Sequence, residues 1–162
     1  MIFGNKEIFA IECEKSSFRD GIAFVRAHFY INDEELGDFE ETEMHGTVVL
    51  AINSLLKFAG LRKINQQVDR VAFSYLHRNM YGEDWRAGMF ENFRDKYSLH
   101  DLFDLAIGDL GYVIYLVTMS DGKSKILVGN REGDYYESLE IEESYVNILL
   151  SDVLAWINEG SP

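Results

Sequence analysis

The amino-acid sequence predicts an α+β fold, in which helices pack mainly on one face of an antiparallel sheet. Several segments alternate apolar and polar residues as half-buried strands do, and others place apolar residues at helical spacing. The order of these segments lacks the strict strand–helix alternation of a parallel sheet. A chain of 162 residues without a linker or repeat is ordinarily one domain, so we expect residues 1–162 to form a single domain.

The N-terminal segment predicts a hairpin of two strands. Residues 7–14 and 22–31 each carry apolar side chains at alternate positions, which is the period of a strand with one buried face. In the second strand, one face carries Ala23, Val25, Ala27, Phe29 and Ile31, and the other carries Phe24, Arg26, His28 and Tyr30. The connection over residues 15–21 fits an antiparallel hairpin, and Asn32-Asp33 can turn the chain into a third strand near residues 35–38.

Helical spacing of apolar residues appears in the middle of the chain and at its C-terminal end. Helices are expected over residues 43–59, 66–79, 98–107 and 143–158. Thr42 is the expected N-cap of the first of these helices, and Gly60 is its expected C-terminal stop. Residues 80–97 mix aromatic and charged side chains without a clean period, so they support no assignment.

Three strands are expected between the last two helices. They cover residues 112–119, 125–128 and 135–141, with a two-residue hairpin turn at Asp121-Gly122. The apolar run from Tyr112 to Met119 is far shorter than the roughly 20 residues that a membrane helix needs. Cys13 is the only cysteine and falls on the apolar face of its strand. We therefore expect a cytoplasmic protein that has no disulfide, with Cys13 in the core rather than acting as a nucleophile.

Acidic residues are concentrated in two blocks of the sequence. Residues 33–43 hold seven carboxylates and no base, and residues 132–143 hold six carboxylates with Arg131 just outside. The net charge is −7 over residues 1–56, +3 over residues 57–96 and −9 over residues 97–162. Such a distribution attracts a basic partner and repels nucleic acid, so we expect neither direct nucleic-acid binding nor membrane binding.

Motifs for catalysis or metal binding are not evident. The four histidines, His28, His45, His77 and His100, lie too far apart for a local zinc motif, and we expect them on the face of a sheet or on helix and loop surfaces. Gly122-Lys123-Ser124 lacks the upstream glycine and the following helix of a phosphate-binding loop. We therefore expect no enzyme activity, cofactor or metal, and an enzyme with a site assembled from distant residues is the least favoured alternative.

The acidic blocks have two interpretations. Exposed carboxylates keep a protein soluble and prevent association at strand edges. However, the first block also contains Leu36 and Phe39, and the second lies next to tyrosines at positions 135, 136 and 145. Apolar anchors among charges are typical of a protein–protein interface. In both interpretations the blocks are expected to be uniformly solvated.

Several short segments resemble the immunity protein 42 family. They are Ile2-Phe3-Gly4, Phe9-Ala10-Ile11-Glu12, and Tyr30-Ile31-Asn32 leading to Leu36-Gly37-Asp38, with Asn147 to Leu150 near the C-terminus. The resemblance covers about the first 40 residues in detail and the rest in the order of its elements, while residues 60–100 match nothing. It implies a small α+β protein of bacterial polymorphic-toxin and contact-dependent inhibition systems. Such a protein binds the toxic C-terminal domain of a cognate effector, and the resemblance carries over no catalytic residue.

The resemblance and the charge pattern together predict a basic toxin domain as partner. If the toxin is a nuclease, it needs a basic groove for phosphates, and an acidic protein can occupy that groove. The expected toxin-binding residues are Asp33, Glu34, Glu35, Asp38, Phe39, Glu40 and Glu41. The alternative from another class is a cytoplasmic secretion chaperone, which is also small, acidic and α+β.

Overall fold

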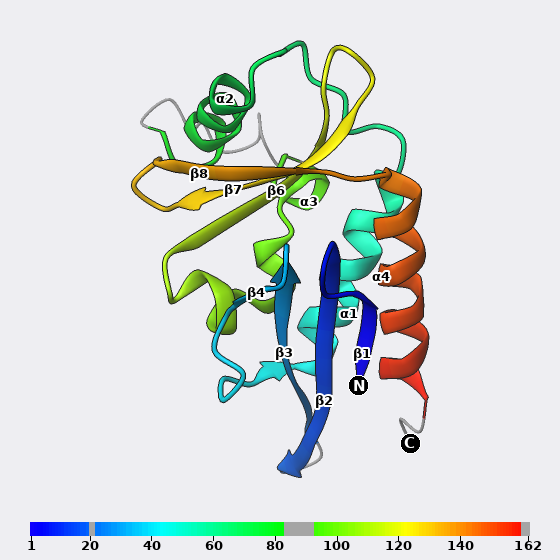
Figure 1. Ribbon diagram of the computed structural model, residues 1–162. Coiled ribbons are helices and arrows are strands. Elements are labelled where there is room, and N and C mark those ends of the chain that lie inside the picture. The colour runs from blue at the N-terminus through cyan, green and yellow to red at the C-terminus, as the bar shows by residue number, and fades with distance from the viewer. Residues whose placement is uncertain (20–21, 83–92, 160–162) are drawn as a thin grey trace.

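The computed structural model describes residues 1–19, 22–82 and 93–159 and confirms the α+β class. The strands form two antiparallel sheets (Figure 1). The N-terminal sheet runs alongside helices α1 (His45–Lys57) and α4 (Glu143–Asn158), and the second sheet crosses above its strands in this view. Helix α2 (Asp69–Tyr81) covers the far side of the second sheet.

The N-terminal sheet has the strand order β1-β2-β3-β4, and β5 pairs with β3 as well. Its strands are β1 (Ile2–Asn5), β2 (Phe9–Arg19), β3 (Ile22–Ile31), β4 (Glu34–Leu36) and β5 (Glu43–Met44). The expected alternation is confirmed, because Phe9, Ile11 and Cys13 are fully buried in the core. Strand β2 runs further than expected, and β1 is too short to show a period in the sequence.

Helix α1 begins later than the sequence predicts. Thr42 was expected to cap it, but the N-cap is Met44, which makes no side-chain capping bond. The prediction is wrong because Glu43 and Met44 pair with β3 as strand β5, which keeps the chain extended beyond Thr42. The apolar stripe of α1 is buried as expected, and Gly60 adopts a φ of +75° in the turn after the helix.

The second sheet is buried on both faces along its first two strands. Its strands are β6 (Tyr112–Thr118), β7 (Ser124–Asn130) and the half-exposed edge strand β8 (Tyr135–Glu140). Ile114, Leu116, Ile126 and Val128 join the core beneath the N-terminal sheet, α1 and α4. Val113, Tyr115, Val117 and Leu127 join a second core with Ala72, Phe73 and Leu76 of α2. Burial on both faces explains why the sequence of β6 is a continuous apolar run rather than an alternating one.

Residues 93–108 form short pieces instead of the expected helix over residues 98–107. They comprise α3 (Phe93–Tyr97), a 3₁₀ turn η1 (His100–Phe103) and a π turn η2 (Asp104–Gly108). Ser98 bridges to β6, and the Leu99 N–H donates to the carbonyl of Ile114 at 2.9 Å. A regular helix cannot run through residues whose backbone groups pair with a strand.

A buried ion pair joins the two halves of the fold. The Arg62 side chain is fully buried, and its Nε donates to the carbonyl of Lys96 at 2.7 Å. Its other nitrogens donate to the carbonyl of Leu55 and to the Glu143 carboxylate. Glu143 also accepts from the Gly60 N–H at 3.0 Å and is only 15% exposed. The prediction that both acidic blocks are uniformly solvated is therefore wrong for Glu143, because this carboxylate neutralises a buried arginine.

We expect Arg62→Met to destabilise the protein strongly. The substitution keeps an aliphatic side chain but leaves the Glu143 carboxylate without its cation. Removing one partner of a buried ion pair costs about 3–5 kcal/mol, so the free energy of unfolding should fall by that amount. Urea denaturation followed by circular dichroism measures it. The exposed Arg70 on α2 is the matched control, and Arg70→Met should change stability by less than about 0.5 kcal/mol. Equal losses in both variants would contradict this role of Arg62.

Candidate functional site

The first acidic block lies at one edge of the N-terminal sheet, on the β3–β4 turn, strand β4 and the segment that follows (Figure 1). Asn32 and Asp33 form the turn with φ values of +52° and +66°, a region that Asn and Asp tolerate better than most residues. We name as the β4 acidic surface the residues Asp33, Glu34, Glu35, Asp38, Phe39, Glu40 and Glu41. All are exposed except Asp38 and Phe39, which are half-buried.

The backbone of this surface is fixed against turn η2. The Asp38 N–H donates to the carbonyl of Ala106 at 2.8 Å, and an Asp38 carboxylate oxygen accepts from the Glu40 N–H at 2.9 Å. Gly37 has a φ of +124°, and a side chain there would meet Ile107 at 2.6 Å. Leu36, which the sequence suggested as an interface anchor, is instead buried in the core. The carboxylates are therefore presented by an anchored segment.

Glu43, the last acid of the first block, has a structural role. It is buried, and its carboxylate accepts from the Leu105 N–H at 2.5 Å. Burial raises the pKa of Glu43, although the backbone hydrogen bonds oppose this effect. The expectation of uniform solvation is wrong here too, because this carboxylate satisfies backbone donors at the start of the π turn.

The two acidic blocks differ in how their carboxylates are used. Within the described part of the chain, no ion pair involves Asp33, Glu34, Asp38, Glu40 or Glu41. The second block instead makes internal contacts, with Glu140 paired to Lys123, Glu143 to Arg62, Asp134 to Asn130 and Glu137 to Asn32. The Asn32–Glu137 hydrogen bond, 3.3 Å long, also brings the two blocks side by side.

Two residues of the β4 acidic surface, Glu35 and Phe39, meet a buried histidine on β3. His28 is only 3% exposed, and Phe39 packs edge-on against its ring with centroids 4.8 Å apart. A Glu35 oxygen lies 3.7 Å from Nδ1 of His28, and a Glu12 oxygen from β2 lies 3.7 Å from Nε2. Tyr30 completes the group, with its ring centroid 4.9 Å from that of His28. We name these five residues the His28 cluster.

The sequence predicted the position of some residues of this cluster but not their contacts. Alternation along β3 placed His28 and Tyr30 on the face opposite the core, as the structure confirms. The pairing of Glu12 with His28 requires the hairpin register, and the approach of Phe39 requires the turn after β4. His28 therefore lies on a sheet face as expected, whereas His100 is fully buried and contradicts the expectation of a surface position.

Charge within the His28 cluster is set by burial and by Lys6. Burial lowers the pKa of His28, and the nearby Glu35 and Glu12 only partly oppose this effect. Burial also acts to raise the pKa of Glu12, but hydrogen bonds from Tyr30 and Lys6 outweigh it and hold that pKa below its ordinary value. Near pH 7 the cluster therefore combines the ionised Glu12 carboxylate with a neutral His28 imidazole.

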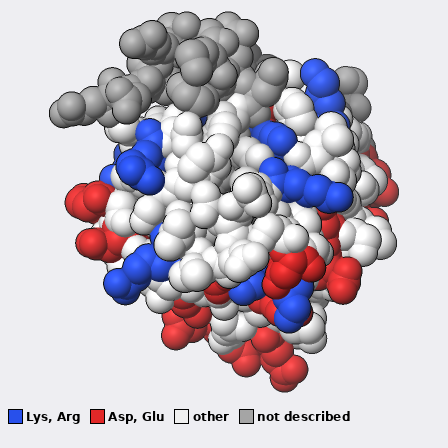
Figure 2. Space-filling model, turned by 90° about the horizontal axis from the view of Figure 1, so that it is seen from above, with Lys and Arg blue, Asp and Glu red and all other residues white. Residues whose placement is uncertain are grey.

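The face of the molecule over α2 differs in charge from the β4 acidic surface. Figure 2 shows this face as largely uncharged, with Lys and Arg scattered over it and Asp and Glu gathered towards its edge. Helix α2 contributes the exposed Arg70 and Arg78, and apolar side chains are exposed at Val71 and Tyr75 on the helix and at its N-cap, Val68. Helix α2, with its two exposed arginines, thus covers the second sheet on the side away from the N-terminal sheet.

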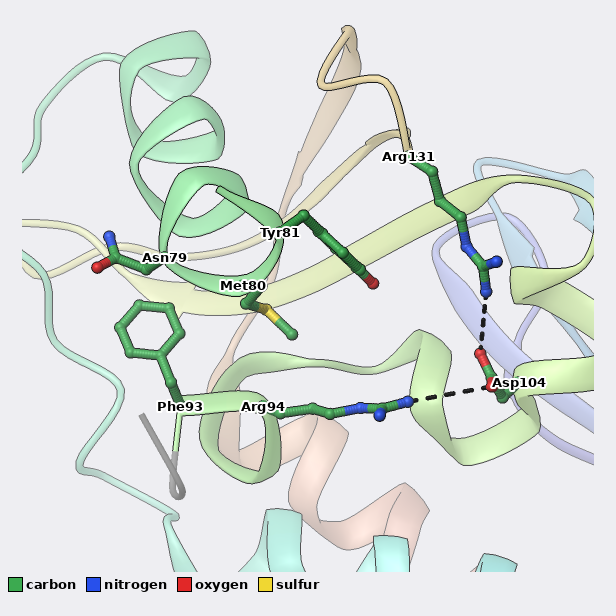
Figure 3. A pocket seen from close by; sticks show the side chains of 7 residues that line it. All are labelled: Asn79, Met80, Tyr81, Phe93, Arg94, Asp104 and Arg131. Atoms are coloured by element: carbon green, nitrogen blue, oxygen red, sulfur yellow. Dashed lines mark hydrogen bonds and ion pairs between the residues drawn. The ribbon is translucent and has the colours of Figure 1, made fainter. Parts of the chain in front are cut away.

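A cavity of about 410 Å³ opens between α2, α3 and the β7–β8 connection. Arg94 and Arg131 reach into it from opposite sides towards Asp104, at 4.0 Å and 3.3 Å (Figure 3). Arg94 also binds both oxygens of Asp101 at 2.5 Å. Both guanidinium groups are thus already neutralised by carboxylates, which disfavours the cavity as a site for an anionic ligand.

His100 lies behind the cavity wall and does not reach its interior. Its Nε2 lies 2.9 Å from the Tyr81 hydroxyl, and its Nδ1 lies 2.9 Å from the Ser98 hydroxyl. Ser98 and His100 are both buried, so this serine–histidine contact offers no atom to a substrate in the cavity. Its role is to satisfy polar groups between α2 and β6.

The family model of immunity protein 42 matches residues 1–156. This chain belongs to the Immunity protein 42 family. The match includes residues 60–100, for which the sequence alone suggested no relationship. Neither a curated protein nor a solved structure matches the chain.

Family membership places this immunity protein in a toxin system and implies a toxin as its partner. Cys13 is buried as expected, and burial raises the pKa of its thiol to about 12, so it does not act as a nucleophile near neutral pH. Among the described residues, His, Cys, Asp and Glu side chains form no group of three or more that could hold a metal ion. None of the described helices has the length and apolar character needed to cross a membrane.

We expect the immunity protein to lose stability as the pH falls from 7 to 5. Burial lowers the pKa of both His28 and His100, so in this range the unfolded chain binds more protons than the folded one. Stability is therefore present above the ordinary imidazole pKa of about 6.5 and is lost below it, by at most about 1.4 kcal/mol per pH unit for each histidine. Urea denaturation at several pH values measures this slope.

The variants His28→Asn and His100→Asn test whether these two histidines cause the pH dependence. Each should reduce the pH dependence of the unfolding free energy, whatever it does to stability at pH 7. His100 faces Tyr81, Arg94, Asp101 and Asp104, and its removal tests that environment. The raised pKa of Glu43 changes the unfolding free energy in the opposite direction as the pH falls. The test therefore compares the slope of each variant with the slope of the wild type. A slope unchanged in both variants would contradict the assignment.

Proposed function

We propose that the β4 acidic surface binds a basic surface of the cognate toxin domain, and that the toxin is a nuclease whose phosphate-binding groove is thereby occupied. The observation that supports this choice is that Asp33, Glu34, Asp38, Glu40 and Glu41 form no ion pair with any residue that the structure describes. A protein that needed acids only for internal pairing would use them as the second block does. Carboxylates in this arrangement can replace phosphates opposite lysine and arginine side chains.

Electrostatic attraction then accounts for both speed and selectivity of binding. The chain carries a net charge of −13, and its densest acidic segment without ion pairs lies on this surface. Opposite fields accelerate association with a basic groove, and the arrangement of individual carboxylates selects the matching toxin. Phe39, half-buried at the centre of the segment, supplies an apolar contact among the charges.

The same proposal holds that the chain acts in the cytoplasm by binding alone, without catalysis. Ser98 and His100, which make a contact that would suit a nucleophile and its base, are buried away from solvent. The arginines of the cavity are held by Asp101 and Asp104. These contacts support a structural role for the groups that most resemble an active site.

Reversing the charge of the surface should weaken binding to the cognate toxin domain. In the variant with Glu34, Glu35, Asp38 and Glu40 changed to Lys, we expect the association rate at low salt to fall by roughly tenfold or more. Stopped-flow fluorescence measures that rate. The control variant changes four exposed acids elsewhere to Lys, namely Glu14, Asp109, Glu142 and Asp152. Because the two variants have the same net charge, similar rates for both would refute the proposed surface.

Co-expression separates this function from that of a secretion chaperone. The immunity protein should restore growth of cells that produce the toxin domain, and it should co-purify with that domain at a one-to-one ratio. A chaperone would form a homodimer and leave its effector active. Growth that stays inhibited, despite a stable complex, would therefore argue against the proposed function.

A further inference from the structure

The His28 cluster contains a hydrogen-bonding mismatch. Neither ring nitrogen of His28 has a hydrogen-bond partner among the described residues, although the side chain is only 4% exposed. A neutral imidazole has one N–H and one lone pair, while both nitrogens face carboxylate oxygens, of Glu12 and Glu35, at 3.7 Å. One nitrogen therefore presents its lone pair to an oxygen that can only accept. A donor that reaches the carboxylate oxygen and the lone pair from one side would satisfy both, and buried polar atoms in proteins are rarely left without a hydrogen-bond partner.

The contacts of Lys6 show that the cluster can bind a cation. Its Nζ lies 3.2 Å from a Glu12 oxygen and 3.6 Å from the centroid of the Tyr30 ring, so it has both an ion pair and a cation–π contact. The Tyr30 hydroxyl donates to the same Glu12 oxygen at 3.0 Å. Lys6 does not pair with Glu35, whose side chain is 54% exposed beside His28. The half of the cluster at Glu35 and Phe39 is thus without a cation.

The backbone of Lys6 is fixed, whereas its side chain is not enclosed. Its carbonyl accepts from the Asp33 N–H at 2.8 Å, which holds the β1–β2 turn against the β4 acidic surface. The side chain is 35% exposed and lies at the rim of the cluster. It can therefore move into solvent without disturbing the core.

We propose that the His28 cluster is a binding site for a lysine or arginine side chain of the toxin domain, and that Lys6 occupies part of this site in the free protein. The incoming cation lies between Glu12 and Glu35, with its aliphatic stem along Phe39 and its charge over Tyr30. The identity of the partner rests on the proposed function, whereas the site itself rests on the geometry of the cluster.

An NMR titration tests the site without the toxin. The probes are N-acetyl-lysine amide and N-acetyl-arginine amide, and N-acetyl-norleucine amide is the uncharged control. We expect both cationic probes to shift the ring signals of His28, Tyr30 and Phe39 in Lys6→Met, with affinity roughly five- to tenfold higher than in the wild type. The variant Lys123→Met removes a lysine that pairs with Glu140 on the other sheet, and it should behave like the wild type.

Two further variants connect the shifts to the proposed contacts. In the Lys6→Met background, Tyr30→Leu should abolish most of the binding, and Glu35→Gln should weaken it without disturbing the core, because that side chain is exposed. The proposal is overturned if the probes leave the cluster signals unchanged in Lys6→Met, or if norleucine amide shifts them equally.

The toxin supplies a second, separate arm of the experiment. Lys6→Met should bind the toxin domain more tightly than Lys123→Met, although both variants lose one positive charge. If the probes bind and the toxin does not, the site stands and the proposed function fails. If the toxin binds and the probes do not, the proposed function stands and the site fails.

Discussion

The buried ion pair between Arg62 and Glu143 is the constraint on which the relative placement of the elements depends. A fully buried guanidinium is costly unless its donors are satisfied, and here they bind the end of α1, the carbonyl of Lys96 next to Tyr97, and the first residue of α4. Glu143 in turn accepts from Gly60, in the turn after α1, and from the Thr118 hydroxyl at the end of β6 at 3.5 Å. As the first helical residue of α4, Glu143 also places a negative charge at the positive end of the helix dipole, which stabilises the helix. One arginine thus fixes both long helices of the first core against the second sheet.

That placement also separates the charges of the molecule. The second sheet is buried on both faces along its first two strands, so it divides a core beneath the N-terminal sheet from a core beneath α2. The β4 acidic surface lies on the N-terminal side, on an edge strand and the segments next to it. Helix α2 lies on the far side, where it exposes Arg70 and Arg78. Because the two sides are separated by a packed layer, the basic residues do little to screen the acidic surface.

Local patterns predicted most elements of this fold, and long-range pairing accounts for the rest. The alternation in β2 and β3 and the stripe of α4 depend only on neighbouring residues, so they were readable in the sequence. The division into two sheets was not, because strand period does not say which strands pair. The break at Ser98 arises from pairing with β6, and the delayed start of α1 arises from pairing with β3. At the site, the acidic segment was visible as composition, but the contact of Phe39 with His28 needs the folded turn.

A cluster of like charges costs stability, and the way this fold tolerates that cost bears on its function. Neighbouring carboxylates repel one another. Among the described residues, the only cation that pairs with the β4 acidic surface is His28, which lies beside Glu35 and is a cation only when protonated. The segment is nevertheless anchored, because Leu36 is buried and the Asp38 N–H donates to the carbonyl of Ala106. Its backbone therefore loses little freedom when a partner binds, and neutralising the repelling charges adds to the free energy of association. The acids that weaken the free protein are, on this reasoning, the ones that strengthen its complex.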